Sequence, residues 1–360
     1  MTIKPSPTSQ TRLHESSTGV ITAGRVETSE LTLSKCATPM GFAVTRAAPT
    51  GPLAIVNVVP GAATLWQGET TTFAAKGQDA TYNAVALAPA EVVWSVDGPG
   101  KISAAGRYSA TAAGTATVAA TARGVTGTAT VAVRLDSYPP VARAPAHAFV
   151  TGSDLGLSTV PIRVEWAAAT DKGRGVAGYE LERYVGEAWT AVPLARATDL
   201  SATVALAPAQ VHRFRVRAVD RAGNVSAWAT AGAFRLGAVQ ESSSAVVRKG
   251  KWTRRDSPSF YGRRAVSAQQ SGASAKIDFT GQQVAWLSAL GPTRGQARVY
   301  VDGTYVKTVD LQSETLATRE VVFVRSWTSS GKHTLEIRVV GTSGRPRVDV
   351  DAFLSIAPVK

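Results

Sequence analysis

The sequence predicts an all-β chain in which three β-sandwich domains follow one another after an extended N-terminal leader. Apolar and polar residues alternate in short runs, which is the period of a half-buried strand. Gly, Pro, Ser and Asp separate these runs, and the alanine-rich stretches are broken by Gly, Thr and Pro rather than spaced as in a helix. The 360 residues suit three cores of about 100 residues each plus a tail.

The alternation is clearest in the C-terminal third of the chain. Ile277 and Phe279 share one face of a predicted strand, and Val299 and Val301 share one face of another. Asp302-Gly303 follows directly, which is a strong signal for a two-residue hairpin turn. Further apolar runs lie at 321–324, 334–339 and 348–353. Six or more short strands separated by turn residues predict an antiparallel sandwich or jelly roll.

Four short motifs in residues 238–360 resemble the galactose-binding-like jelly rolls. The motifs are Gly291–Gly295, Val299–Gly303, Gly331–Leu335 and Val350–Phe353. Domains of this kind are often attached to bacterial secreted or surface proteins as carbohydrate-binding modules. The resemblance therefore implies a sugar-binding or adhesive domain, although it names no sugar.

Residues 53–135 resemble the bacterial Ig-like domain of group 2. The residues that support the resemblance are the alternating runs at 55–60, 70–74, 92–95, 106–109, 114–120 and 128–133, with Gly68-Glu69 before the second run. The resemblance places Trp94 between the two sheets, as a core tryptophan. It implies a spacer or an attachment collar rather than a binding domain.

Residues 136–237 begin with a Pro-rich linker and then resemble a fibronectin type III domain. The strands at 162–166, 178–184 and 212–220, with Arg221–Ser226, carry this resemblance. It implies that Trp166 and Tyr179 are core residues. His212 stands where that family usually has a tyrosine, so we expect a looser or pH-sensitive corner. Arg213, Arg215 and Arg217 alternate on one strand, and we expect them to form a solvated face.

The leader, residues 1–52, contains short apolar pairs that are too few to bury a core. Its segment Gly19–Ser34 resembles the Gly-Val-Ile-Thr-Ala repeats in the stalks of bacteriophage tail fibres and tail-tip proteins. The resemblance implies an assembly segment that forms a homotrimer and joins virion or cell-surface structural proteins. The alternative is a flexible tail.

Cys36 is the single cysteine, so the chain forms no intramolecular disulfide. Met1–Gln10 is polar and lacks the apolar core of a secretory signal, and no stretch is apolar for the length of a transmembrane segment. The resemblances nevertheless point outside the cell. Release within a virion, or a signal removed from this numbering, would reconcile the two observations.

The net charge of +13 is concentrated in the C-terminal domain, where residues 240–360 have 18 Lys and Arg against 10 Asp and Glu. The basic residues cluster at Arg248, Lys249, Lys251, Arg254, Arg255, Arg263 and Arg264. Such a cluster attracts polyanions. Anionic cell-wall polymers, acidic polysaccharide, a membrane surface and nucleic acid are the candidates, and a solvated loop is the alternative. We expect no specific nucleic-acid partner.

Catalytic residues are not predicted, so the chain is not expected to be an enzyme. No two of the four histidines stand at ligand spacing. The sequence contains no nucleophile elbow in a strand–turn–helix context and no phosphate-binding loop.

Asp349 and Asp351 share one face of a predicted strand, so they are candidates for an acid/base pair or a calcium ligand set. In related jelly rolls an acidic residue near the last strand often joins one near the first in binding a structural calcium. The resemblance places Asp351 and Glu241 in these positions, but Ser242 replaces the usual second acidic residue. A turn or a salt bridge is the alternative, and no other cofactor is expected.

A sugar site needs an exposed aromatic ring beside hydrogen-bonding side chains. Aromatic residues and arginines come together in turn-rich stretches of residues 252–263 and 325–327. We predict that Trp252, Tyr261 and Arg263 frame a glycan site, with local packing of the rings as the alternative. The predicted ligand contacts are Trp252, Arg254, Arg255, Tyr261, Arg263 and Trp327. Trp286 is expected in the core.

Two functions fit these predictions. The first is a virion surface protein, a tail fibre or decoration, that displays a carbohydrate-binding domain for host attachment. The second is a secreted or cell-wall-associated bacterial adhesion or carbohydrate-binding protein, acting as the accessory part of a polysaccharide-degrading system. In both, the partner is a surface glycan or an anionic cell-wall polymer.

Overall fold

The computed structural model describes residues 50–359, and its regular structure is β-strand except for two short 3-10 turns, η1 (Pro89–Glu91) and η2 (Tyr261–Arg263). The predicted all-β class is confirmed. The chain divides into two compact units between Asp136 and Ser137. Within residues 50–359, no helix has the length and apolar character that crossing a membrane requires. The predicted assembly segment lies almost wholly outside the described residues, as does Cys36.

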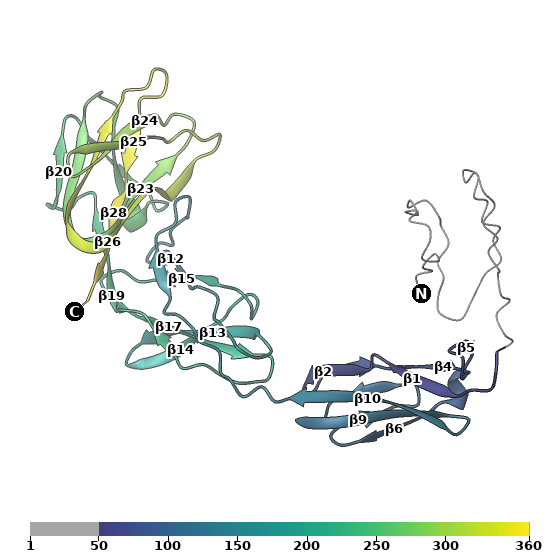
Figure 1. Ribbon diagram of the computed structural model, residues 1–360. Helices are drawn as coiled ribbons and strands as arrows, with labels where there is room; N and C mark the ends of the chain where they lie inside the picture. The colour runs from purple at the N-terminus through teal and green to yellow at the C-terminus, as the bar shows by residue number, and fades with distance from the viewer. Residues whose placement is uncertain (1–49, 360) are drawn as a thin grey trace, which may run out of the picture. The chain divides into compact units, whose positions relative to one another are not determined.

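The first unit contains a sandwich of two main sheets with strand orders β2-β10-β9-β6 and β1-β4-β5, and a small sheet β3-β8-β7 (Figure 1). β2 runs parallel to β10, whereas the other strand pairs of the first unit are antiparallel. The strands are β1 (Ile55–Val59), β2 (Ala62–Trp66), β3 (Thr70–Thr72), β4 (Ala74–Gln78), β5 (Ala84–Val85), β6 (Val93–Asp97), β7 (Lys101–Ile102), β8 (Arg107–Ser109), β9 (Gly114–Ala122) and β10 (Val125–Arg134).

The core of the first unit is built around Tyr108 and Phe73, whose rings meet edge to face at 6.4 Å. Trp94 is half-buried and packs against this core from β6. The prediction of Trp94 as a core tryptophan therefore holds only in part, since the indole packs against the core but is not fully buried. The reason is that β6 lies at the edge of its sheet, so one side of the indole has no neighbouring strand.

The second unit begins with a middle sandwich, whose sheets have the orders β11-β12-β15 and β14-β13-β17-β18. Trp166 and Tyr179 are buried in its core, as predicted. His212 is also buried, and its Nε2 lies 2.8 Å from the Ala207 carbonyl oxygen. The strands are β11 (Ala146–Ala148), β12 (Val160–Glu165), β13 (Val176–Val185), β14 (Ala188–Val192), β15 (Ser201–Leu206), β16 (Val211–His212), β17 (Phe214–Asp220) and β18 (Ala229–Thr230).

The solvated face expected from the sequence is present only in part, because Arg213 is exposed whereas Arg215 and Arg217 of β17 are half-buried. The Arg215 guanidinium lies between the rings of Trp189 and Trp228, at 4.3 and 4.2 Å from their centroids. Its Nε also donates to Glu182 at 2.7 Å. Stacking and pairing therefore hold this arginine in place on the sheet.

The C-terminal sandwich has a large sheet of order β16-β19-β28-β23-β26-β24-β25, with β20 beside β23, and a three-stranded sheet β21-β22-β27. Asp302 and Gly303 both have positive φ, 51° and 79°, between β24 and β25. The predicted hairpin is confirmed, since two left-handed residues make the turn type that matches strand twist. The strands are β19 (Phe234–Gln240), β20 (Val246–Lys249), β21 (Thr253–Asp256), β22 (Arg264–Ala268), β23 (Ser274–Leu290), β24 (Gln296–Val301), β25 (Thr304–Asp310), β26 (Ala317–Val339), β27 (Val348–Val350) and β28 (Ala352–Pro358).

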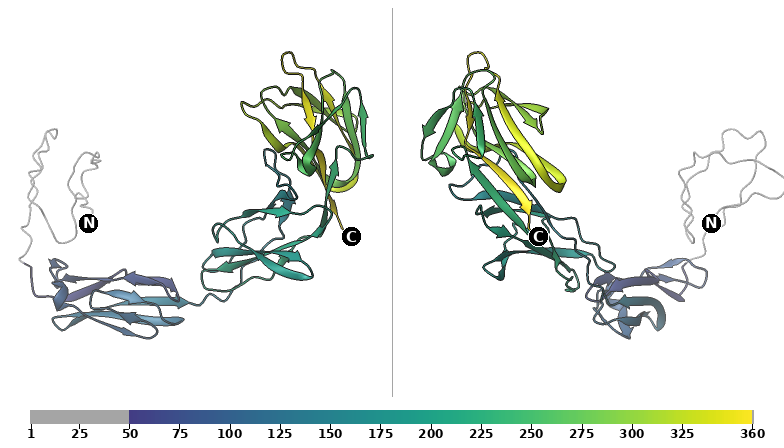
Figure 2. Two further views of the ribbon diagram at one scale, coloured as in Figure 1. Left: turned by 180° about the vertical axis from the view of Figure 1, so that it is seen from behind. Right: turned by 90° about the vertical axis from the view of Figure 1, so that its left-hand side faces the viewer.

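Strand β19 belongs to both sandwiches of the second unit, and the predicted boundary at residue 237/238 falls inside it. Its start pairs with β16, at His212↔Phe234, and its whole length pairs with β28. In both views of Figure 2 the end of β28 lies beside the middle sandwich. Leu206 of the middle sandwich and Leu287 of the C-terminal sandwich belong to one continuous core. The two sandwiches are therefore joined by a common sheet and a common core.

Candidate functional site

Two acidic residues are fully buried where the C-terminal sandwich begins and where its last strands meet. Glu241 follows β19, and Asp351 lies between β27 and β28. The Glu241 backbone N–H donates to the Asp351 carbonyl at 3.3 Å, and the Tyr261 backbone N–H donates to Asp351 Oδ2 at 3.1 Å. Both carboxylate oxygens of Glu241, and Oδ1 of Asp351, have no hydrogen-bond partner within residues 50–359.

Burial determines the electrostatics of this pair. Loss of solvent raises the pKa of Glu241, and the guanidinium of Arg264 opposes this, with its Nε 3.5 Å from Glu241 Oε1. Loss of solvent also raises the pKa of Asp351 to about 8, and the charge of Glu241 adds to the rise. Two carboxylates with three oxygens that accept no hydrogen bond are costly to bury in the ionised form.

The buried pair has carboxylate oxygens of the kind that a calcium ion takes as ligands. Calcium takes six to eight oxygen ligands, including carboxylates bound through one or both oxygens. Glu241 and Asp351 present three oxygens without a hydrogen-bond partner, of which Glu241 Oε1 forms an ion pair with Arg264, from two segments that the fold already holds together. The covering turn has two successive residues at positive φ, Gly262 (63°) and Arg263 (67°). A non-glycine residue in that region is strained, which indicates that surrounding contacts hold the turn in place.

The glycan site predicted from Trp252, Tyr261 and Arg263 is not assembled. Tyr261 is buried in the core shared by the two sandwiches, whereas Trp252 packs against the separate core of the C-terminal sandwich. Arg263 is exposed and lies with Leu157 and Pro258 around a shallow depression. Tyr261 therefore serves the core and, through its backbone, Asp351. The turn-rich composition of this stretch predicts an exposed ring, but η2 places the Tyr261 ring in the core.

Trp252 and the two arginines of β21 contact other groups. Trp252 Nε1 donates to the Lys249 carbonyl at 3.0 Å. Arg254 pairs with Asp256 at 2.8 Å, and Arg255 Nε donates to Ser267 Oγ at 3.1 Å. Because neighbouring strand residues point to opposite sides, Arg254 and Arg255 lie on different faces of β21.

Trp327 is presented by an irregular segment of the large sheet. Ser326 pairs with Gln283 and Gly331 pairs with Gly281, so residues 327–330 of β26 face the single residue Gln282 of β23. Such a bulge breaks the alternation of a strand and re-aims its side chains. Trp327 is half-buried, while Thr328, Ser329 and Ser330 are exposed.

A histidine supports the Trp327 ring from one side. The two rings are stacked, with centroids 3.9 Å apart and planes at 16°, and Phe279 lies against both. His333 Nδ1 is 2.8 Å from Asp302 Oδ2, so the hairpin turn between β24 and β25 fixes the imidazole. The result is an aromatic ring held on a rigid support and followed in the chain by three exposed hydroxyl side chains.

The two tryptophans of the predicted site are far apart. Lys249, near Trp252, pairs with Ser274 at one end of β23, whereas Ser326, next to Trp327, pairs with Gln283. Nine residues separate Ser274 and Gln283, or about 30 Å along a strand. The six predicted ligand contacts therefore do not form one site.

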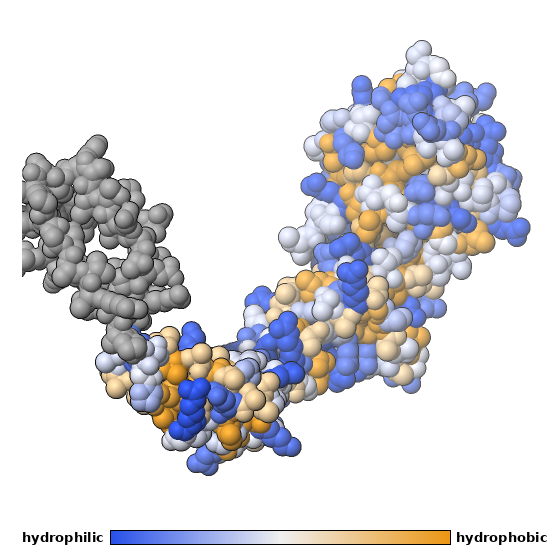
Figure 3. Space-filling view, turned by 90° about the vertical axis from the view of Figure 1, so that its right-hand side faces the viewer, coloured by the Kyte–Doolittle hydropathy of each residue, from blue (hydrophilic) through white to orange (hydrophobic). Residues whose placement is uncertain are grey.

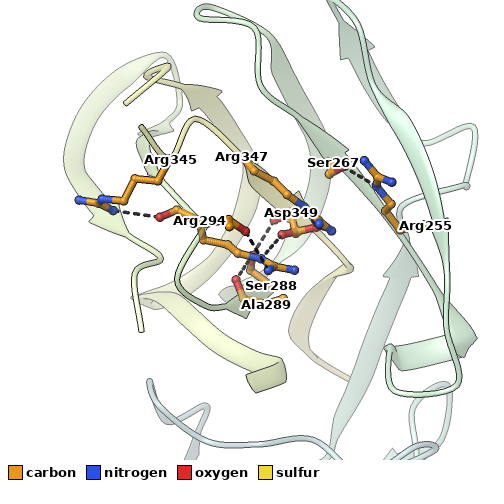
Figure 4. A network of polar contacts seen from close by, with 9 residues as sticks. Arg255, Ser267, Ser288, Ala289, Arg294, Arg345, Arg347 and Asp349 are labelled. Atoms are coloured by element: carbon orange, nitrogen blue, oxygen red, sulfur yellow. Dashed lines mark hydrogen bonds and ion pairs between the residues drawn. The ribbon is translucent and has the colours of Figure 1, made fainter. Parts of the chain in front are cut away.

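The sequence prediction did not include the arginines around Asp349 (Figure 4). Arg294 Nε donates to Asp349 Oδ2 at 3.0 Å, and Arg347 donates to Oδ1 at 3.0 and 2.6 Å. The signal was present in part, because Arg345, Arg347, Asp349 and Asp351 alternate in the sequence. That spacing predicts one shared strand face. Arg294, 55 positions before Asp349, gives no such signal.

The outer face of the large sheet holds another group of aromatic residues that the sequence did not single out. The Arg338 guanidinium lies 4.1 Å from the centroid of the Tyr300 ring. Tyr305 meets Tyr300 edge to face and is 52% exposed.

Comparisons with known proteins are limited to parts of the chain, and no protein-family model matches it. The chain is 43% identical over 81 residues to endoglucanase B of Cellulomonas fimi, which is 22% of this chain and 8% of that protein. It is 29% identical over 112 residues to an A type blood alpha-D-galactosamine galactosaminidase of Flavonifractor plautii, which is 31% of this chain and 10% of that protein. The chain thus spans about a tenth of the length of these relatives.

Two of the solved structures that match are carbohydrate-binding modules. One is the CBM36-1 domain of a multidomain xylanase from the hindgut metagenome of Trinervitermes trinervoides, with 14% identity, 35% of this chain and 99% of that chain covered, and a TM-score of 0.27. The other is a family 35 module from Clostridium thermocellum, with 16% identity, 34% and 98% covered, and a TM-score of 0.23.

Proposed function

We propose that this chain is a non-catalytic, extracellular carbohydrate-binding protein of the secreted or cell-wall-associated kind, and the accessory part of a polysaccharide-degrading system. The names of the partial relatives support this proposal, because both are glycosidases. They favour the second function predicted from the sequence over the virion tail fibre. The structural observation that carries the proposal is the supported indole of Trp327.

Trp327 stacks on His333 and packs against the core of the C-terminal sandwich, and in this proposal the exposed part of its ring receives the apolar C–H face of a sugar. An aromatic ring fixed before binding loses little conformational freedom when the ligand arrives. The hydroxyl groups of Thr328, Ser329 and Ser330 can then exchange hydrogen bonds with the sugar hydroxyls. His333 and Asp302 act behind the ring as positioning residues.

The other sandwiches act as spacers in this proposal. The first unit resembles an Ig-like domain and the middle sandwich resembles a fibronectin type III domain, and neither has a predicted ligand site. Glu241 and Asp351 would hold a structural calcium, whose charge would stabilise the ionised pair. No step of chemistry is assigned to that ion.

The test is binding of the full chain to a panel of soluble polysaccharides by affinity gel electrophoresis. The wild-type chain should be retarded by at least one neutral polysaccharide, and Trp327→Ala should lose about tenfold or more in affinity, since stacking on an aromatic ring is worth about 1–3 kcal/mol. Tyr305→Ala is the matched control, because it removes an exposed ring from a different face. Near-UV circular dichroism checks that both variants are folded.

Two results would count against the proposal. Unchanged retardation of Trp327→Ala, with loss in Tyr305→Ala, would move the site to the outer sheet face. Release of reducing sugar from any retarding polysaccharide by the purified chain would contradict the non-catalytic role.

A further inference from the structure

We propose that the three-stranded sheet β21-β22-β27 carries a second binding site, for the carboxylate groups of an acidic polysaccharide. The site consists of Arg294 and Arg347, which pair with the buried Asp349, and of Arg255, which is bonded to Ser267 on the strand beside Asp349. It lies apart from Trp327 and so goes beyond the glycan site described above. Only the choice of a polysaccharide as the carrier of the carboxylates rests on the proposed function.

The strand register brings these side chains to one face. Thr253 pairs with Ser267, and Ser267 pairs with Asp349, so the three residues form one row across the sheet. The bond from Arg255 Nε to Ser267 Oγ places its guanidinium over the middle of that row. Figure 4 shows Arg294 and Arg347 meeting at Asp349, and Arg255 reaching toward Ser267 from the neighbouring strand.

The cluster holds more positive than negative charge. Asp349 is fully buried, and both of its carboxylate oxygens already accept from Arg294 and Arg347. Arg255 makes no ion pair within the part of the chain that the structure describes. Arg294 and Arg347 thus share one carboxylate, and Arg255, bonded to Ser267, has none, which leaves a surplus of two positive charges among the three arginines.

A fourth arginine does not add to the surplus. Arg345 Nη2 is 2.8 Å from Asp310 Oδ2, so it is neutralised by its own carboxylate. It also donates to the Arg294 carbonyl at 2.9 Å, which fixes the backbone of the central arginine. The surplus therefore belongs to Arg255, Arg294 and Arg347.

The donors are organised before any ligand binds. The side chain of Arg294 is 9% exposed and that of Arg347 is 20% exposed, and Asp349 holds both. Asp349 already takes Arg294 Nε and both Nε and Nη2 of Arg347, so these two arginines supply fixed positive charge. The exposed Arg255 is held through its Nε by Ser267 and keeps its two Nη groups for a ligand, whose carboxylate oxygens match that planar fork. The chemistry selects an oxyanion, and carboxylate is the class that a polysaccharide of uronic acids repeats along its length.

The surroundings suit a charged polymer. Hydrophilic surface gathers at the end of the C-terminal sandwich farthest from the middle sandwich (Figure 3). Lys249 and Lys251, which lead into β21, are exposed. These charges extend the positive field beyond the three arginines, so successive carboxylates of one chain can be attracted at once.

The experiment compares polygalacturonate with its fully methyl-esterified form, using the full-length chain in affinity gel electrophoresis at one ionic strength. The wild-type chain should be retarded by polygalacturonate and not by the ester. Arg255→Gln should weaken this binding by about tenfold, the scale expected for a charge-assisted hydrogen-bond pair. Arg255→Lys keeps the charge but not the fork and should recover only part of the loss.

The charge-matched control is Arg298→Gln, an exposed arginine of β24 in the other sheet, which should bind as the wild type. Equal losses in Arg255→Gln and Arg298→Gln would show a diffuse charge effect and overturn the site. Stronger binding to dextran sulfate or to a DNA duplex than to polygalacturonate would overturn the carboxylate assignment. Failure of the wild type to bind polygalacturonate would overturn the proposal as a whole.

The outcome for Trp327 separates this site from the first one. Trp327→Ala should weaken binding to neutral polysaccharides and leave polygalacturonate binding unchanged. If Trp327→Ala has no effect on neutral polysaccharides, the proposed function fails while the arginine site stands. If Trp327→Ala abolishes polygalacturonate binding as well, the arginines are not a separate site and the inference fails.

Discussion

Replacing Asp351 by Asn tests the buried carboxylate pair most directly. Burial raises the pKa of Asp351 from 3.8 to about 8. The folded state therefore keeps a proton that the unfolded state has already lost between those pH values. Because the folded state binds more protons there, this carboxyl group lowers the free energy of unfolding as the pH rises from about 4 to 8. Asn cannot ionise, so the variant lacks this slope.

The size of this effect on the free energy of unfolding follows from the pH range between the pKa values of Asp351 in the unfolded and folded states. Each unit of pKa difference corresponds to about 1.4 kcal/mol. From pH 5 to pH 8, the difference in the free energy of unfolding between wild type and Asp351→Asn should change by about 4 kcal/mol, in favour of the variant at the higher pH.

The comparison with the variant is necessary because buried histidines act in the opposite direction. Burial lowers the pKa of His147 to about 4 and also lowers the pKa of His212. Both residues therefore cost stability as the pH falls below about 6.5. Their contributions are the same in the wild type and the variant, and they cancel in the difference.

The assay is urea unfolding followed by tryptophan fluorescence, at pH 5 and pH 8, with chelator and then with calcium. Calcium binds the ionised pair, so it should stabilise the wild type more at pH 8 than at pH 5, and it should not stabilise Asp351→Asn. Asp278→Asn, an exposed carboxylate of β23, is the control and should keep the wild-type behaviour. Parallel pH profiles for wild type and Asp351→Asn in chelator would refute the assignment of the raised pKa. Equal melting of the wild type with calcium and with chelator would refute the metal site.

Three further predictions concern the second unit. His147→Phe keeps the stack on Phe234 but cannot ionise. It should therefore remove about 2 kcal/mol of the loss in the free energy of unfolding between pH 6.5 and pH 5, measured by urea unfolding. An unchanged dependence of stability on pH in this range would contradict the prediction. Residues 137–360 should fold when expressed alone, whereas residues 238–360, which lack the first half of β19, should show no cooperative melting by circular dichroism. Asp349→Asn leaves two guanidinium groups without their carboxylate and should cost about 3–5 kcal/mol in urea unfolding; a loss below about 1 kcal/mol would mean that the pairs contribute little.

The strands could be predicted because their signals are local. The hairpin between β24 and β25 follows from alternation and from Asp302-Gly303, which needs no knowledge of the rest of the chain. The bulge at Trp327 could not be predicted in this way. It exists because Ser326 and Gly331 pair with residues two apart on β23, and that register is decided by the partner strand.

A candidate site could be predicted from the sequence pattern when its residues are close together in the chain, and not when distant segments bring them together. Tyr261 sits among turn residues, but the cover that buries its ring comes from the shared core of two sandwiches. Glu241 and Asp351, predicted from a family resemblance, do lie together although 110 positions separate them. Arg294 and Asp349 are also distant in the sequence, and no local pattern signals that they pair.

The strand β19, which both sandwiches share, affects how this chain can fold during its synthesis on the ribosome. β19 emerges after the middle sandwich, but β28, which covers its other edge, comes more than a hundred positions later. Until then Phe234 and Leu236 belong to an unfinished sheet edge, and such edges recruit other chains. The middle sandwich therefore cannot complete its sheet until β28, the last strand of the C-terminal sandwich, has been synthesised. Slow synthesis of residues 241–351 would lengthen the period in which nascent chains can associate.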